Sequence, residues 1–125
     1  MRLLLDTHTL LWLMVDSPRL SRRARSLISD ASEIYVSSVS IWEIAIKFRL
    51  GKIEEDARVV VEKLGAAGLR ELNVSHRHAV ATSRLPLLHG DPFDRLLVAQ
   101  AITELMQFLT ADKRLTEYSD LVICA

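Results

Sequence analysis

Short apolar runs alternate with helical patterns along almost the whole of this 125-residue chain. Runs rich in Leu, Ile and Val that are bounded by turn residues are typical of strands buried on both faces of a parallel sheet. Strands that alternate with helices in this way predict an α/β fold around a mainly parallel sheet. The expected strands, of which the third is an edge strand, are Arg2–Leu5, Glu33–Ser37, Leu69–Val74, Gln107–Ala111 and Leu121–Cys124.

Helix start and stop signals stand between these runs. Ser21 and either Ser37 or Ser38 are suited to cap helix N-termini. Gly51 suits a helix C-terminus, and the segment 16–18, which contains a proline, breaks the first helix. No internal repeat or linker is visible, so residues 1–125 are expected to form a single domain. The expected helices cover residues 7–15, about 22–31, 38–50, 55–67, about 75–84 and 93–106.

Composition excludes several classes of protein. Half of the residues are hydrophobic, which provides for a core and excludes a disordered chain. The longest apolar runs are far shorter than the ~20 residues of a membrane span, and Asp6 ends the apolar start too early for a signal peptide. The single cysteine, Cys124, provides neither a disulfide framework nor a thiolate metal cage. We therefore expect a cytoplasmic protein with no membrane partner.

Four carboxylates occupy positions where such a fold collects functional groups. Ligands of open parallel sheets bind just beyond the carboxyl ends of the strands. Asp6 and Asp112 directly follow expected strands. Glu43 lies on an almost wholly apolar helix that is expected to be mostly buried, and Asp94 shares a helix face with residues that pack on the sheet. Each acid alone also fits an ordinary role, such as a helix cap, an ion pair, a capping box or a turn residue.

Considered together, the four acids predict a metal site. Carboxylates within several ångströms of one another repel unless a cation neutralises them. Oxygen ligands without cysteine or regular histidine spacing select hard cations, here Mg²⁺ or Mn²⁺. Such an ion polarises a phosphodiester and supplies a hydroxide for in-line attack, and the choice between one ion and two stays open. We therefore expect Asp6, Glu43, Asp94 and Asp112 to be both the metal ligands and the catalytic residues.

Residues beside these acids have two interpretations each. Lys47, one helical turn from Glu43, and Arg95, next to Asp94, either pair with a carboxylate or reach a substrate phosphate. Asp91 precedes a proline at a helix start, which favours a capping role over membership of the site. A phosphatase centred on Asp6 would need a second acid two residues further on, where this chain has a histidine.

The remaining histidines and tryptophans have ordinary interpretations. His76 and His78 are spaced so that their rings face apart on a helix, which favours surface or capping roles over zinc binding. Trp12 and Trp42 are expected in the core or at a subunit interface rather than in base stacking.

Each of the four acids lies in its own motif. The motifs are Leu5–His8, Ser37–Ile44 followed by Gly51–Ile53, Asp91–Ala101 and Leu109–Asp112. In this order and spacing they resemble the motifs of PIN-domain nucleases, and more closely those of the VapC-type toxins of prokaryotic toxin–antitoxin pairs. The resemblance runs from Met1 to about Tyr118, which is nearly the whole chain.

The resemblance implies a three-layer α/β/α sandwich and a metal-dependent endoribonuclease, a hydrolase that cleaves cellular RNA and is silenced by a cognate VapB-like antitoxin. It also implies a homodimer that contacts operator DNA only through the antitoxin. Two alternatives stay open, a catalytically silent protein-interaction module of the same fold and a nuclease directed at DNA. The candidate substrate contacts beside the four acids are Thr7, Lys47, Arg95 and Thr110.

Overall fold

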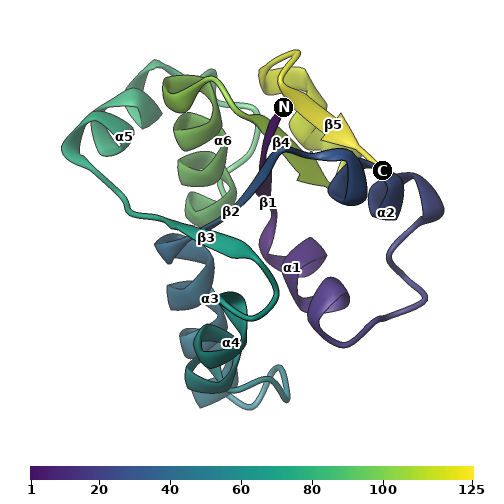
Figure 1. Ribbon diagram of the computed structural model, residues 1–125. Helices are drawn as coiled ribbons and strands as arrows, with labels where there is room; N and C mark the ends of the chain where they lie inside the picture. The colour runs from purple at the N-terminus through teal and green to yellow at the C-terminus, as the bar shows by residue number, and fades with distance from the viewer.

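A five-stranded sheet, parallel throughout, forms the centre of the protein in a computed structural model that describes residues 1–125 (Figure 1). The strand order is β3-β2-β1-β4-β5, and all four neighbouring pairs are parallel. The prediction of a mainly parallel sheet with its third strand at an edge is therefore confirmed. The strands are β1 (Arg2–Leu5), β2 (Glu33–Ser37), β3 (Leu69–Leu72), β4 (Gln107–Thr110) and β5 (Val122–Cys124).

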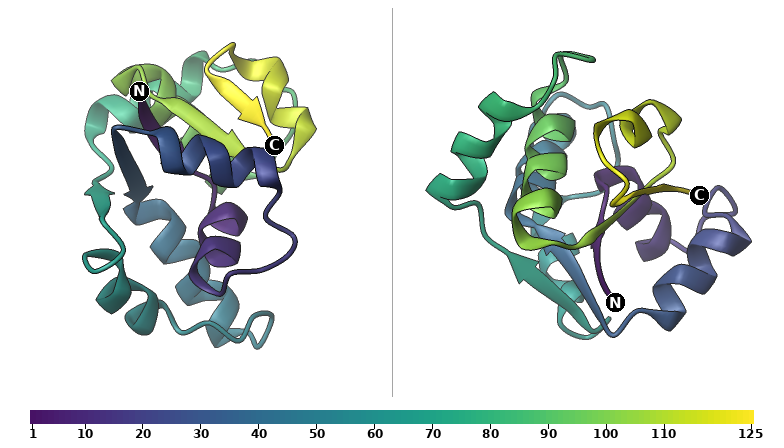
Figure 2. Two further views of the ribbon diagram at one scale, coloured as in Figure 1. Left: turned by 45° about the vertical axis from the view of Figure 1, so that its right-hand side comes forward. Right: turned by 90° about the horizontal axis from the view of Figure 1, so that it is seen from above.

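Helices cover both faces of this sheet. Seen from above, α1 and α2 lie on one side, and α6, with α5 outside it, lies on the other (Figure 2). None of the helices is both long and apolar enough to cross a membrane. The helices are α1 (Thr7–Met14), α2 (Arg22–Asp30), α3 (Ser38–Arg49), α4 (Ala57–Leu64), α5 (His76–Ala81) and α6 (Pro92–Glu104), with short 3-10 helices η1 (Thr82–Arg84) and η2 (Lys113–Tyr118).

The central strand β1 explains the three layers. Its side chains alternate between the faces of the sheet, and Leu3, Leu4 and Leu5 are all fully buried. Leu3 and Leu5 belong to a core cluster shared with α1, α2 and α4. Leu4 belongs to a second cluster, which includes Phe108 of β4 and Leu97 of α6. The three successive buried leucines of β1 thus require helices on both sides, which is the expected α/β/α sandwich.

The order of the strands brings the four predicted acids to one edge. The chain runs from β1 to β2 and β3 on one side of the sheet and then returns to β4 on the other side of β1. The reversal opens a crevice beyond the carboxyl ends of β1 and β4, where ligands of such sheets bind. Asp6 directly follows β1, and Asp112 lies two residues beyond Thr110, the last residue of β4.

The structure departs from the sequence prediction in two places. The segment Lys113–Tyr118, for which no element is predicted, forms η2, capped by the Asp112 side chain. The expectation that α3 is mostly buried is wrong, because the helix continues past the edge of the sheet (Figure 1). Trp42 is 60% exposed, and it packs edge-on against Phe93 at a ring-centroid distance of 5.3 Å instead of entering the core.

Replacing Leu4 with alanine tests whether β1 holds the two layers together. Because Leu4 is fully buried in the core cluster that contains Phe108 of β4 and Leu97 of α6, we expect L4A to lower the free energy of unfolding by about 2–5 kcal/mol in a urea titration. The matched control is L87A, since Leu87 is 92% exposed, and we expect it to change stability by less than about 0.5 kcal/mol. Equal effects of the two variants would contradict this description of the core.

Candidate active site

A pocket of about 350 Å³ lies beyond the carboxyl ends of β1 and β4 and contains all four predicted acids. A larger cavity of about 700 Å³ lies along α5 and α6, but no carboxylate lines it. We therefore take the smaller pocket as the candidate site on its chemistry. Its ten lining residues are Asp6, His8, Trp12, Glu43, Lys47, Asp91, Asp94, Ala111, Asp112 and Arg114.

Asp6 is fixed by backbone and side-chain hydrogen bonds from two elements. Its own amide donates to the carbonyl of Leu109 in β4, so its main chain continues the pairing of the strands. Oδ1 accepts from the amide of Thr7 at 2.7 Å, as a helix cap does, and Oδ2 accepts from the hydroxyl of Thr110 at 2.6 Å. Asp6 is 7% exposed, and this burial raises the pKa of its carboxyl despite the two hydrogen bonds.

Glu43 is the most deeply buried acid of the pocket, at 4% exposed. The capping box considered from the sequence does not form, because α3 begins earlier, with Ser37 as its N-cap. The alternative ion pair does form, since Lys47 donates to Oε2 at 2.6 Å from one helical turn away. The other oxygen, Oε1, is buried and has no hydrogen-bond partner. Leaving such an acceptor unpaired costs free energy, so this oxygen is available to a ligand.

Asp94 lies in the first turn of α6 and is half-buried. Its amide donates to Oδ1 of Asp91, the N-cap of the helix, at 3.0 Å. Burial first, and then repulsion from Asp6, Asp91, Glu43 and Asp112, raise the pKa of the Asp94 carboxyl to about 7. An acid so perturbed inside a pocket is typical of a functional site.

Asp112 has the opposite electrostatic surroundings. Arg114 donates to it from Nε at 3.1 Å and from Nη2 at 2.8 Å, and these hydrogen bonds hold the pKa of the Asp112 carboxyl below its usual range. The backbone amide of Arg114 also donates to Oδ1 at 3.0 Å, which makes Asp112 the cap of η2. Structural capping and membership of the pocket are therefore compatible at this position, as they are at Asp6.

The donor set of the pocket fits a hard divalent cation. Five carboxylates line it against two cationic side chains, Lys47 and Arg114, so the wall carries a net negative charge. Oxygen ligands alone suit Mg²⁺ or Mn²⁺, and the unpaired Oε1 of Glu43 is an acceptor that such an ion would satisfy. The carboxylates share one pocket, although no three of them are arranged as a ready-made metal-binding group.

The four predicted substrate contacts are placed very differently. Lys47 lines the pocket, whereas the hydroxyl of Thr7 donates to Ser40 at 2.9 Å, away from the pocket. Thr110 is fully buried and orients two acids, because it donates to Asp6 and accepts from the amide of Asp112 at 3.0 Å. Neither threonine is among the lining residues.

Arg95 lies outside the pocket. Its guanidinium donates to the carbonyls of Pro86 at 2.8 Å and Thr82 at 3.0 Å, and it lies against the ring of Tyr118. Its neighbour in sequence, Asp94, points into the pocket because adjacent residues of a helix face about 100° apart. Sequence proximity to an acid therefore does not place Arg95 at the site.

Five lining residues were not assigned to the site from the sequence: Ala111, Asp91, for which a capping role was favoured, and three further side chains. His8 and Trp12, on successive turns of α1, form an edge-on pair with ring centroids 6.1 Å apart. Their i, i+4 spacing after Asp6 is the signal that places them on one face of that helix. Arg114 is the third, and only the local turn at Asp112 brings it to the pocket. His78 caps α5, as expected, since it completes a capping box with Ser75.

Comparison with known proteins agrees with the fold and with the family resemblance noted in the sequence. The family model described as the PIN domain matches residues 3–121. Ribonuclease VapC22 of Mycobacterium tuberculosis is 31% identical over 118 residues, which are 92% of this chain and 90% of that protein. Ribonuclease VapC16 of the same organism is 38% identical over 69 residues, 49% of each chain.

Solved structures share the architecture at low sequence identity. VapBC2 from Rickettsia felis, bound to a DNA fragment from its promoter, has a chain that superposes with a TM-score of 0.72 and 16% identity, covering 100% of this chain and 98% of that one. FitAcB from Neisseria gonorrhoeae gives a TM-score of 0.66 at 15% identity, over 98% and 96% of the two chains. At this identity the likeness establishes the fold.

The parallel sheet, the acids beyond its strand ends and the family match together define a PIN-domain protein. The identity to VapC22 over nearly the full length of both chains is specific enough to assign the chain to one family within the PIN-domain proteins. This chain belongs to the VapC family of PIN-domain proteins, and the resemblance noted in its sequence is confirmed.

The raised pKa of Asp94 predicts a pH-dependent cost in stability when no divalent cation is present. Between about pH 4 and pH 7 the unfolded chain loses this proton before the folded one does, so the fold loses stability as pH rises. We expect D94N, which cannot become charged, to match the parent protein near pH 4 and to exceed its unfolding free energy by about 1–2 kcal/mol above pH 7, after allowance for solvent screening.

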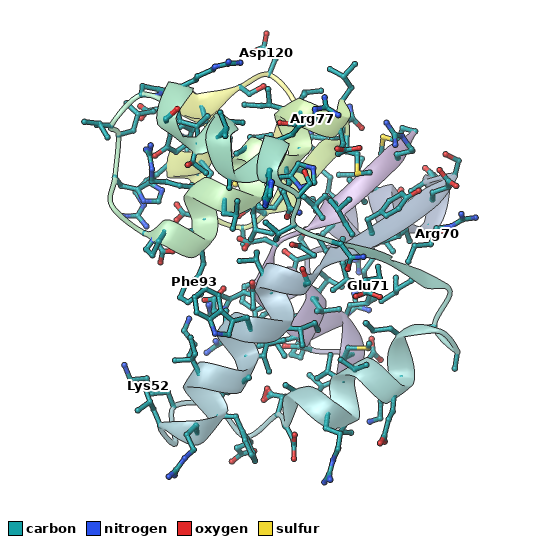
Figure 3. The ribbon with its side chains drawn as sticks, turned by 90° about the vertical axis from the view of Figure 1, so that its left-hand side faces the viewer. Lys52, Arg70, Glu71, Arg77, Phe93 and Asp120 are labelled. Atoms are coloured by element: carbon teal, nitrogen blue, oxygen red, sulfur yellow. The ribbon has the colours of Figure 1, made fainter.

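Urea unfolding in EDTA at several pH values measures this difference. The matched control is D120N, because Asp120 is exposed and points away from the body of the protein in Figure 3. A stability difference between D94N and the parent protein that stays constant from pH 4 to pH 8 would show that the pKa of Asp94 is not raised.

Proposed function

We propose that this protein is a metal-dependent endoribonuclease that acts as the toxin of a toxin–antitoxin pair in the cytoplasm. The observation that carries the proposal is the acidic pocket, in which the buried Oε1 of Glu43 has no partner and the pKa of the Asp94 carboxyl is raised by burial and by the neighbouring carboxylates. Its relatives are named as ribonucleases, which supports RNA as the substrate.

Asp6, Glu43, Asp94 and Asp112 are the residues that would hold Mg²⁺ or Mn²⁺. When bound, the ion polarises the phosphodiester and activates water as the nucleophile for in-line attack. The protein's own contribution is to fix the oxygens in advance. Thr110 holds Asp6 from the next strand, and Lys47 holds one oxygen of Glu43 while the other stays free.

Asp94 is the acid of the pocket whose charge can change near neutral pH. With a pKa of about 7, its carboxyl is about half protonated at neutral pH, and a bound cation would favour the loss of this proton. Lys47 is the pocket cation placed to approach a phosphate oxygen, since its side chain is 32% exposed beside the buried Glu43. The net negative wall repels the RNA backbone, so the substrate approaches closely only after a divalent cation has offset that charge.

Removing either central acid should abolish cleavage. We expect D6N and D94N each to slow the hydrolysis of single-stranded RNA by at least about 100-fold, because losing the cation removes several kcal/mol of transition-state stabilisation. EDTA should stop the parent protein, and added Mn²⁺ should restore it. The control variant D120N should cleave at the parent rate, and gel assays of labelled oligonucleotides measure all of these rates.

The same assay separates the alternative functions. Cleavage of RNA that persists in D6N and D94N would overturn the assignment of the acids. Preferential cleavage of DNA of the same sequence would identify a DNA-directed nuclease. No metal-dependent cleavage of either polymer, with Mn²⁺ still bound, would favour a catalytically silent interaction module.

We also propose a homodimer and a VapB-like antitoxin as partners, with operator DNA contacted only through the antitoxin. The fold is shared with chains from VapBC assemblies, and α3 exposes apolar side chains such as Trp42 and Phe48 that an interface would cover. Light scattering should give about twice the chain mass of 14.1 kDa. The product of a small neighbouring reading frame should co-purify with the protein and inhibit RNA cleavage, and a monomer that no such product inhibits would contradict the proposal.

A further inference from the structure

Arg114 occupies the oxygens of an acid that a metal ion would also need. A carboxylate offers about four lone-pair positions in all. On Asp112 three are in use, because Oδ1 accepts from the amide and Nε of Arg114 and Oδ2 accepts from its Nη2. The protein uses two positions on Asp6, one on Glu43 and none on Asp94. Asp112 is therefore the acid of the pocket whose oxygens are least available.

The Arg114 guanidinium is held by Asp112 alone. Its side chain is 71% exposed, and its Nη1 donates no hydrogen bond within the protein. Arg95 shows the contrast, because three protein oxygens accept hydrogen bonds from it and hold it on the far side of α6. Exposed ion pairs contribute little to stability, so moving the Arg114 side chain away from Asp112 has a small energetic cost.

Because the pocket is negatively charged, a displaced Arg114 is suited to bind an RNA phosphate there. RNA brings phosphates to a wall with five carboxylates, and Lys47 is the only other cationic side chain that lines it. Lys47 is paired with the buried Glu43 at 2.6 Å, so a phosphate that it approaches would share its ammonium group with that carboxylate. A guanidinium binds phosphate oxygens through two parallel hydrogen bonds, and Arg114 is exposed at the mouth of the pocket with donors to spare.

We propose that Arg114 and a divalent cation compete for Asp112, and that Arg114, once displaced, binds a phosphate next to the scissile bond as a substrate-positioning residue. The inference rests on the proposed ribonuclease function. It adds a defined order of events, in which binding of the cation frees the arginine that then holds the RNA.

Calorimetric titration with Mn²⁺ alone tests the competition without any cleavage assay. We expect R114Q to bind Mn²⁺ about two- to five-fold more tightly than the parent protein, the range of an exposed ion pair. R114K keeps the charge but loses the paired hydrogen bonds, so its affinity should be intermediate. K113Q, which removes a neighbouring exposed charge that forms no hydrogen bond or ion pair with the Asp112 carboxylate, should stay close to the parent value.

RNA cleavage at saturating Mn²⁺ tests the second half of the proposal. We expect R114Q to lower kcat/KM by about 10-fold or more, because it lacks a charged hydrogen-bond donor to the phosphate. R114K should retain part of the activity and K113Q nearly all of it. The salt dependence of KM should also be weaker in R114Q, by a slope of about 0.7 for one lost contact to a single strand.

The outcomes separate this inference from the proposed function. If the parent protein neither binds Mn²⁺ nor cleaves RNA, the proposed function fails. If it does both while R114Q matches it in Mn²⁺ affinity and in kcat/KM, only the inference fails. An R114K that matches the parent in Mn²⁺ affinity would show that the charge of Arg114, and not competition for the Asp112 oxygens, sets metal binding.

Discussion

The hydrogen bond from Thr110 to Asp6 is the interaction on which the candidate site depends most. It joins the residue after β1 to the last residue of β4, the two strands that flank the crevice, and both partners are buried. The same hydroxyl accepts from the amide of Asp112, so one side chain sets the positions of two acids from different motifs. Replacing it would leave a buried carboxylate oxygen unpaired, at a cost of about 1–3 kcal/mol.

Bringing five carboxylates into one pocket opposes folding, and the structure offsets this cost with local partners. Arg114 and Lys47 each neutralise one acid, and helix starts donate amides to Asp6, Asp91 and Asp112. The Asp94 carboxyl has no such partner, and burial together with repulsion from the other acids raises its pKa. The acid with the fewest partners is therefore the one whose negative charge a cation would stabilise most. The same charge that lowers the stability of the metal-free protein would favour binding of the cation.

The sequence predicts the fold well because its main signals are local. The apolar pattern of β1, the serine caps and the acids that follow strands are all set by neighbouring residues, and each appears where expected within a few residues. The direction in which a side chain points is harder to predict from the sequence than the fold is. Thr7 and Arg95 adjoin acids of the pocket but bond elsewhere, whereas Arg114 reaches the pocket through a turn whose geometry no periodicity reveals. The burial of α3 was overestimated because apolar composition does not tell how far a helix extends beyond its sheet.

The two acids on helices are linked by an aromatic contact outside the core. Trp42 precedes Glu43 on α3, Phe93 precedes Asp94 on α6, and the rings of Trp42 and Phe93 meet edge-on at 71°. Figure 3 shows Phe93 at the start of α6, facing α3. Such a pair contributes about 0.5–1.5 kcal/mol beyond the area that it buries. Since Glu43 repels Asp94, an attraction one residue away from each acid opposes the separation of the two helices and keeps both carboxylates in one pocket.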